Sequence, residues 1–274
     1  MARVLLLLAA LLVAGCSATR FAYNNAEVFL RWNATRYLDV EGAQSEELDA
    51  RIAAFVAWHR ANALPEYALL ATEARKRLAR GLSREDLVWG YDSAQLQLRE
   101  ALRAAAGETA GLLDELTPEQ IEHVKRQFAE DNRKFAREYL SGTAEERRLR
   151  RLKRNLERLE EWFGRLGDVQ VERVRQYSER APFTDGLRDR ERKRLQAEFL
   201  GMLGARQARA RLPDWAAHWD RGRDPGHAAA VRAQLNEYFR MLLDLDKTLT
   251  AEQRQAAETR FRDLAAEFEQ LSRK

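Results

Sequence analysis

The chain has 274 residues, of which 33% are charged and 9% are aromatic. This composition excludes both a disordered chain and a protein embedded in a membrane. The 47 basic residues nearly balance the 43 acidic ones and are interleaved with them, so we expect no nucleic-acid partner. A single cysteine excludes a disulfide framework and a thiolate metal site.

The chain begins with a short apolar segment. Residues 4–14 are all apolar and follow Arg3, which is typical of a signal peptide. The run is too short to cross the ~30 Å of hydrocarbon in a bilayer. It ends in Val13-Ala14-Gly15-Cys16, which resembles the lipobox of bacterial lipoproteins.

This resemblance implies cleavage between Gly15 and Cys16, with a diacylglycerol and an N-acyl chain on the cysteine. An ordinary secretory signal that contains a cysteine is the alternative. Ser17 stands where an aspartate would favour the inner membrane, so the resemblance favours the outer membrane, with the body in the periplasm. We therefore expect a signal peptide over 1–15, and a lipidated cysteine with a short tether over 16–20.

The remaining sequence predicts an all-α fold. Apolar residues recur at helical spacing, and runs of β-branched residues are missing. Two segments alternate apolar residues three and four apart, as in bundles and coiled coils: Leu149, Leu152, Leu156, Leu159, Phe163 and Leu166, then Val231, Leu235, Tyr238, Leu242, Leu245 and Leu249. We expect an array or bundle of about eight to ten helices with shallow-angle antiparallel packing.

One helix-starting motif occurs twice in full. Its copies consist of a leucine, a threonine that caps the helix and a glutamine that reaches back to the threonine amide: Leu116, Thr117 and Gln120, then Leu249, Thr250 and Gln253. Phenylalanines follow each glutamine by eight and fifteen residues, at 128 and 135 and at 261 and 268. Weaker copies without the threonine end in Gln44 and Gln170.

The glutamines are 76 residues apart in the first half and 83 apart in the second. This spacing favours two related halves, residues 21–142 and 143–274. One continuous domain is the alternative, because capping boxes also recur for local reasons.

Two family resemblances follow from these residues. Cys16, Tyr23-Asn24-Asn25, Trp58-His59-Arg60, Leu64-Pro65 and the repeated motif resemble a family of uncharacterised bacterial lipoproteins, known only as a domain of unknown function. The resemblance implies an all-helical periplasmic body and does not indicate any particular activity. The full motifs are also similar to the Leu-Thr-x-x-Gln motif of Spy-type periplasmic chaperones.

Several aromatic residues are candidates for interaction. Trp58, His59 and Arg60 precede a proline-containing turn, but a helix-terminal histidine with Trp58 in the core and Arg60 paired to Glu66 is the commoner outcome. Trp215 and Trp219, one turn apart, fit either stacking on a ligand or packing. The stripe of Val28, Phe29, Trp32 and Tyr37 fits the membrane interface or the core, and we expect core.

No motif for catalysis, metal binding or cofactor binding is present in the sequence. Basic clusters over 147–158 and 188–194 could meet phosphate, although intrahelical ion pairs are the simpler interpretation. We expect a non-enzymatic scaffold or interaction module that is lipid-anchored and uses no cofactor. Its partner would be an envelope protein, an anionic lipid or lipopolysaccharide. The alternative is a Spy-like chaperone that binds unfolded clients.

Overall fold

The computed structural model describes residues 16–273, which are 85% helical and contain no strand. The all-α prediction is confirmed. The α-helices are α2 (Cys16–Asn24), α3 (Ala26–Leu38), α4 (Gly42–Trp58), α5 (Leu64–Ala79), α6 (Arg84–Asp114), α7 (Pro118–Phe135), α8 (Ala144–Phe163), α9 (Asp168–Arg180), α10 (Asp185–Gly204), α11 (Ala208–Ala217), α12 (Pro225–Asp246) and α13 (Ala251–Ser272). Two π-helical turns, η1 (His59–Ala63) and η2 (Ala136–Leu140), extend α4 and α7.

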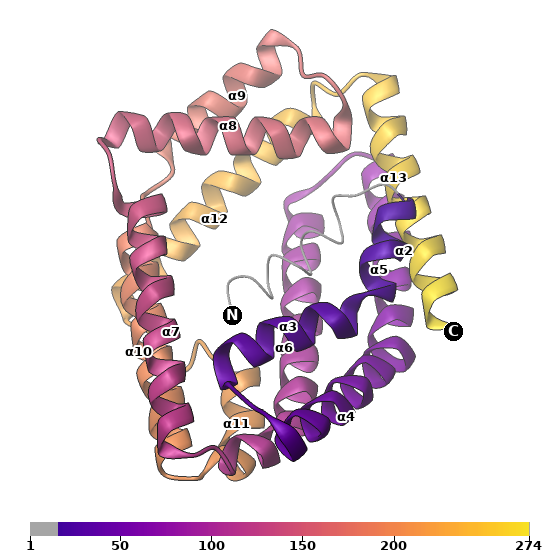
Figure 1. Cartoon of the computed structure of the whole chain (residues 1–274). Coiled ribbons are helices and arrows are strands. Elements are labelled where there is room, and N and C mark those ends of the chain that lie inside the picture. Colours follow the sequence, from indigo (N-terminus) through magenta and orange to yellow (C-terminus); the bar gives the residue numbers. More distant parts are fainter. Residues whose placement is uncertain (1–15, 274) are drawn as a thin grey trace.

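In the view of Figure 1, most helices outline a ring, while α3 and α6 run across its interior. Helices α7 and α10 form one side, α8, α9 and α12 lie across the top, and α5 and α13 form the opposite side. The two halves interlock, because α13 packs along α5, α10 against α7, and α11 against α6. In the part of the chain that the structure describes, no helix is long and apolar enough to cross a membrane.

Side-chain caps fix where several helices begin. Ser83, Thr117, Thr143 and Thr250 each accept a hydrogen bond from the third residue of the helix, whose side chain bonds back to the capping residue's amide. Such a cap contributes about 1 kcal/mol. The sequence predicted the caps at Thr117 and Thr250, and both are confirmed.

Three apolar clusters form the core. The largest joins α4, α6, α7, α10 and α11, the second joins α5 and α13, and the third joins α8, α9 and α12. Along α8 and the loop after it, Leu152, Leu159 and Leu166 are buried as the seam predicts. Leu149, at the first position of that seam, is exposed.

Two expectations near the start of the described chain need revision. Residues 16–20, expected as a tether, form the beginning of α2. The core interpretation of the aromatic stripe is wrong for Val28 and Trp32, which are 68% and 59% exposed, because α3 turns only its other face toward α4 and α7. The predicted signal peptide over 1–15 and cleavage at Gly15 lie outside the described residues.

Candidate functional site

The four motif glutamines meet in two pairs. The amide nitrogen of Gln120 donates to the side-chain oxygen of Gln44 at 2.8 Å and to the carbonyl of Asp39 at 3.0 Å. Gln44 donates to the carbonyl of Glu115 at 3.3 Å. The first pair therefore ties the N-terminus of α4 to the N-terminus of α7.

The second pair repeats this arrangement between α9 and α13. The amides of Gln170 and Gln253 donate to each other at 2.7 and 3.0 Å. Gln253 also donates to the carbonyl of Arg165, and Gln170 donates to that of Thr248. In all four cases the carbonyl belongs to the residue five positions before the partner glutamine (44 − 5 = 39, 120 − 5 = 115, 170 − 5 = 165, 253 − 5 = 248).

The packing around the two pairs is equivalent. Helix α3 contacts both α4 and α7, and α8 contacts both α9 and α13. Of the leucines of the full motifs, Leu116 is buried in the first core cluster and Leu249 is half-buried. The four glutamine side chains therefore hold helix ends together, and each of them both donates and accepts a hydrogen bond there.

His59 lies in an aromatic cluster that joins α2 to the body. Its Nδ1 is 3.0 Å from the hydroxyl of Tyr23, and its Nε2 is 3.3 Å from the hydroxyl of Tyr67. A neutral imidazole has one donor and one acceptor, so one tyrosine accepts a hydrogen bond and the other donates one. Burial lowers the pKa of His59 to about 4 and raises the pKa of both tyrosines to about 12.

The local backbone explains this placement. Pro65 has no N–H to donate, and the chain directly before it widens into η1, where Leu64 N–H reaches the carbonyl of His59. The helix end expected at His59 is therefore replaced by a π turn that continues into α5. Trp58 stacks on Phe55. Arg60 lies over the ring of Tyr23 instead of pairing with Glu66.

The same region fixes α2 through charge. Arg20 donates to both carboxylate oxygens of Glu267, at 3.1 and 2.6 Å, and to the amide oxygen of Gln270. The Glu267 side chain is only 7% exposed, so this bidentate pair is shielded from solvent on one side. The helix that begins at Cys16 is thus attached directly to α13.

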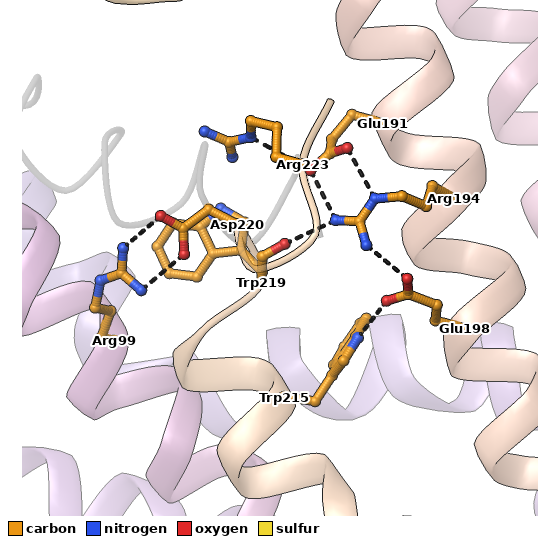
Figure 2. A network of polar contacts seen from close by, with 8 residues as sticks. All are labelled: Arg99, Glu191, Arg194, Glu198, Trp215, Trp219, Asp220 and Arg223. Atoms are coloured by element: carbon orange, nitrogen blue, oxygen red, sulfur yellow. Dashed lines mark hydrogen bonds and ion pairs between the residues drawn. The ribbon is translucent and has the colours of Figure 1, made fainter. Parts of the chain in front are cut away.

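Trp215 and Trp219 belong to a network of polar contacts that joins α6 and α10 to α11 and the residues after it (Figure 2). The Trp215 indole donates to Glu198 at 2.8 Å, and Glu198 accepts from Arg194 at 2.6 Å. Arg99 lies over the Trp219 ring and forms a bidentate pair with Asp220. The structure places both tryptophans in intramolecular contacts, as the packing interpretation expects.

The two basic clusters of the sequence converge on one group of aromatic rings. On α8, Arg147 and Arg151 lie 4.3 and 4.6 Å from the centre of the Phe183 ring. Arg148 lies beside the same ring. From the other cluster, Arg188 and Arg192 lie over Phe135, and Arg154 and Arg188 approach Tyr139. We call these six arginines and three rings the arginine cluster.

Arg151 holds the arginine cluster in place. It is 7% exposed and donates to the carbonyls of Ser178, Ala181 and Pro182, so it holds the loop that carries Phe183. Burial lowers the pKa of Arg151. Tyr177 and Asp185 oppose this decrease, and the charges of Arg154 and Arg148 add to it.

The arginine cluster carries an excess of positive charge. Among the described residues, no ion pair joins Arg147, Arg148 or Arg154 to a carboxylate, and the Nε of Arg147 is buried without a hydrogen-bond partner. A cavity of about 10 Å³, lined by Arg147, Arg150, Arg151 and Arg154 against Glu138 and Asp185, lies within it. The cavity itself is no larger than a water molecule, but the exposed guanidinium groups of Arg148 and Arg154 beside it have the chemistry to bind a phosphate oxygen.

A larger groove borders the arginine cluster. It has a volume of about 440 Å³ and runs between α8 and α9. Its lining combines two arginines and two leucines with two carboxylates and a serine: Arg148, Arg175, Leu149, Leu152, Glu145, Glu179 and Ser178. Arg148 belongs to both sites. The sequence showed the two basic clusters but not their convergence, because Phe183 and Tyr139 have no special spacing relative to them.

Within residues 16–273, no group of three or more His, Asp or Glu residues is arranged to hold a metal ion. Comparison with known proteins gives one family. No curated protein and no solved structure matches the chain. The model of DUF6279, a family of unknown function, matches residues 36–214. The chain therefore belongs to the DUF6279 family, a family of unknown function.

Proposed function

We propose that the protein is a periplasmic lipoprotein, held at the outer membrane by acyl chains on Cys16. Its helical body acts as an interaction or scaffold module without catalysis or cofactor, and nucleic acid is not among its partners. The apolar segment over 4–14 and the small residues before Cys16 support the anchor. The arginine cluster supports binding as the mode of action, and it is the observation that carries the proposal.

The ligand proposed for the arginine cluster is an anionic lipid or lipopolysaccharide. Arg147, Arg148 and Arg154 offer guanidinium groups without carboxylate partners, supported by aromatic rings. The adjacent groove exposes Leu149, which is 53% accessible. A ligand with a phosphate and an acyl chain would use both surfaces, whereas a free phosphate would use only the first.

This binding is tested by replacing Arg147, Arg148 and Arg154 with Gln and titrating the protein with lipopolysaccharide and with inorganic phosphate. A matched control replaces Arg126, Arg133 and Arg232, which have no ion pair in the described chain and whose loss changes the net charge equally. Loss of two or three charge-assisted contacts predicts a decrease in lipopolysaccharide affinity of about tenfold or more. Equal loss in the control variant would show that only the net charge matters.

The anchor is tested by substituting Cys16 with Ala and fractionating the cells. The wild-type chain is expected in the outer-membrane fraction, and the variant in the soluble periplasmic fraction or as an unprocessed precursor. A variant that remains in the outer membrane like the wild type would contradict lipid anchoring.

The second candidate function is that of a Spy-like chaperone. The observation that favours it is the pairing of all four motif glutamines at helix junctions, together with exposed apolar residues such as Leu69 and Leu96. This alternative expects the soluble fragment 17–274 to suppress aggregation of an unfolded client. No suppression at several-fold molar excess would count against it.

A further inference from the structure

Large apolar side chains project from the first two described helices. Phe21 on α2 is 72% exposed, and Val28 and Trp32 on α3 are 68% and 59% exposed. The Phe29 ring lies 6.1 Å from that of Trp32, so the exposed indole is part of an aromatic pair. The other exposed large apolar residues are scattered over α5, α6, α8 and α9.

The surroundings of these side chains carry few charges. Residues 16–35 contain only Arg20, Glu27 and Arg31, which is three charged residues in twenty, against 33% for the whole chain. Arg20 is engaged by Glu267, and Arg31 pairs with Asp49. Uncharged Asn24, Asn25 and Thr35 are also exposed. An aromatic, weakly charged helical surface fits the interface of a bilayer.

The position of this surface in the chain identifies what covers it. The apolar segment over 4–14 ends immediately before α2, and the cysteine that follows it is the first residue of that helix. At 1.5 Å per residue, Phe21 lies roughly 7.5 Å along the helix from Cys16. Because Arg20 and Tyr23 fix α2 to α13 and His59, a membrane that holds Cys16 also lies close to Phe21.

We propose that Phe21, Val28 and Trp32 form a membrane-docking face. This face inserts into the headgroup region of the leaflet that holds the anchor. This inference rests on the proposed lipid anchor and extends it. The acyl chains hold the protein at the membrane, and the docking face sets the orientation of the helical ring on its surface. Trp32 provides an indole of the kind that concentrates at the level of the lipid headgroups.

The experiment uses the lipidated mature protein, residues 16–274, reconstituted into phosphatidylethanolamine/phosphatidylglycerol vesicles. The vesicles carry brominated acyl chains, which quench tryptophan fluorescence. Wild type is compared with Trp32→Phe and with Trp215→Phe, whose indole is engaged by Glu198. Vesicle flotation is measured on the same samples. We expect Trp32→Phe to decrease bromolipid quenching about twofold or more, and Trp215→Phe to leave it nearly unchanged.

The outcomes separate this inference from the proposed anchor. If the protein floats with vesicles but bromolipid does not quench Trp32, the docking face is refuted while the anchor stands. If Trp32 is then shielded from aqueous iodide only in native membranes, the occupant is a protein. If the wild-type protein does not float, the lipid anchor itself is refuted.

Discussion

Substitution of Gln253 by Met tests whether the paired glutamines hold the helical ring together. Methionine keeps the length of the side chain and removes its amide. The substitution removes the bonds of the Gln253 amide to Arg165 and Gln170, the bond that Gln170 returns, and the bond from the Thr250 amide. Gln170 is 4% exposed, so water cannot readily replace its lost partner.

The expected cost follows from these four bonds. At about 1 kcal/mol net for each, and with a buried amide left unpaired, the free energy of unfolding should decrease by about 3–4 kcal/mol. Gln44→Met is the matched control, because Gln44 makes two such bonds in a more exposed position. It should cost about 1–2 kcal/mol.

Equilibrium unfolding in urea, followed by circular dichroism, measures both values. A double-mutant cycle between Gln170 and Gln253 should give a coupling energy of about 1 kcal/mol or more, and Gln44 should show none with Gln253. A cost below about 0.5 kcal/mol for Gln253→Met would refute the structural role of the pair.

Three further predictions concern the His59 cluster, α2 and the arginine cluster. Because burial lowers the pKa of His59 to about 4, below its ordinary value, the unfolded chain takes up the proton first. The free energy of unfolding is therefore unaffected by His59 above pH about 6.5 and decreases by about 3 kcal/mol as the pH falls to 4. In urea unfolding of the His59→Gln variant, this decrease should be absent, and an equal decrease would contradict the prediction. Glu267→Gln should increase hydrogen exchange in α2 and leave exchange in α9 unchanged, whereas unchanged α2 exchange would contradict the attachment. Arg151→Met should decrease the free energy of unfolding by about 2–3 kcal/mol, because three backbone carbonyls lose their donor. It should also decrease the affinity for lipopolysaccharide, because the loop that carries Phe183 is no longer held. An unchanged affinity would contradict the positioning role of Arg151.

Local chemistry made the helices and their starts predictable from the sequence. The threonine, glutamine and proline at 117–120 define a cap without reference to the rest of the chain. The same applies to 250–253. The spacing of the glutamines indicated that they are related, but periodicity cannot show that Gln44 and Gln120, or Gln170 and Gln253, bond to each other across 76 and 83 residues.

The candidate sites depend on tertiary contacts and were less predictable. An aromatic stripe on α3 reads as core in the sequence, yet Trp32 is exposed because only the opposite face finds partners. His59 was expected at the end of a helix, but it lies within a continuing helix and is contacted by Tyr23 and Tyr67 from α2 and α5. No sequence pattern indicates a role for Phe183, because its contacts form only where α8 meets the loop between α9 and α10.

The proposed function depends above all on a lipid on Cys16 that holds the helical body at the membrane. Mass spectrometry of the N-terminal peptide, taken from the protein isolated from membranes, tests it most directly. We expect a chain that begins at Cys16 and carries a diacylglycerol and an N-acyl chain. An N-terminal peptide that retains residues 1–15, or one with an unmodified cysteine, would contradict it.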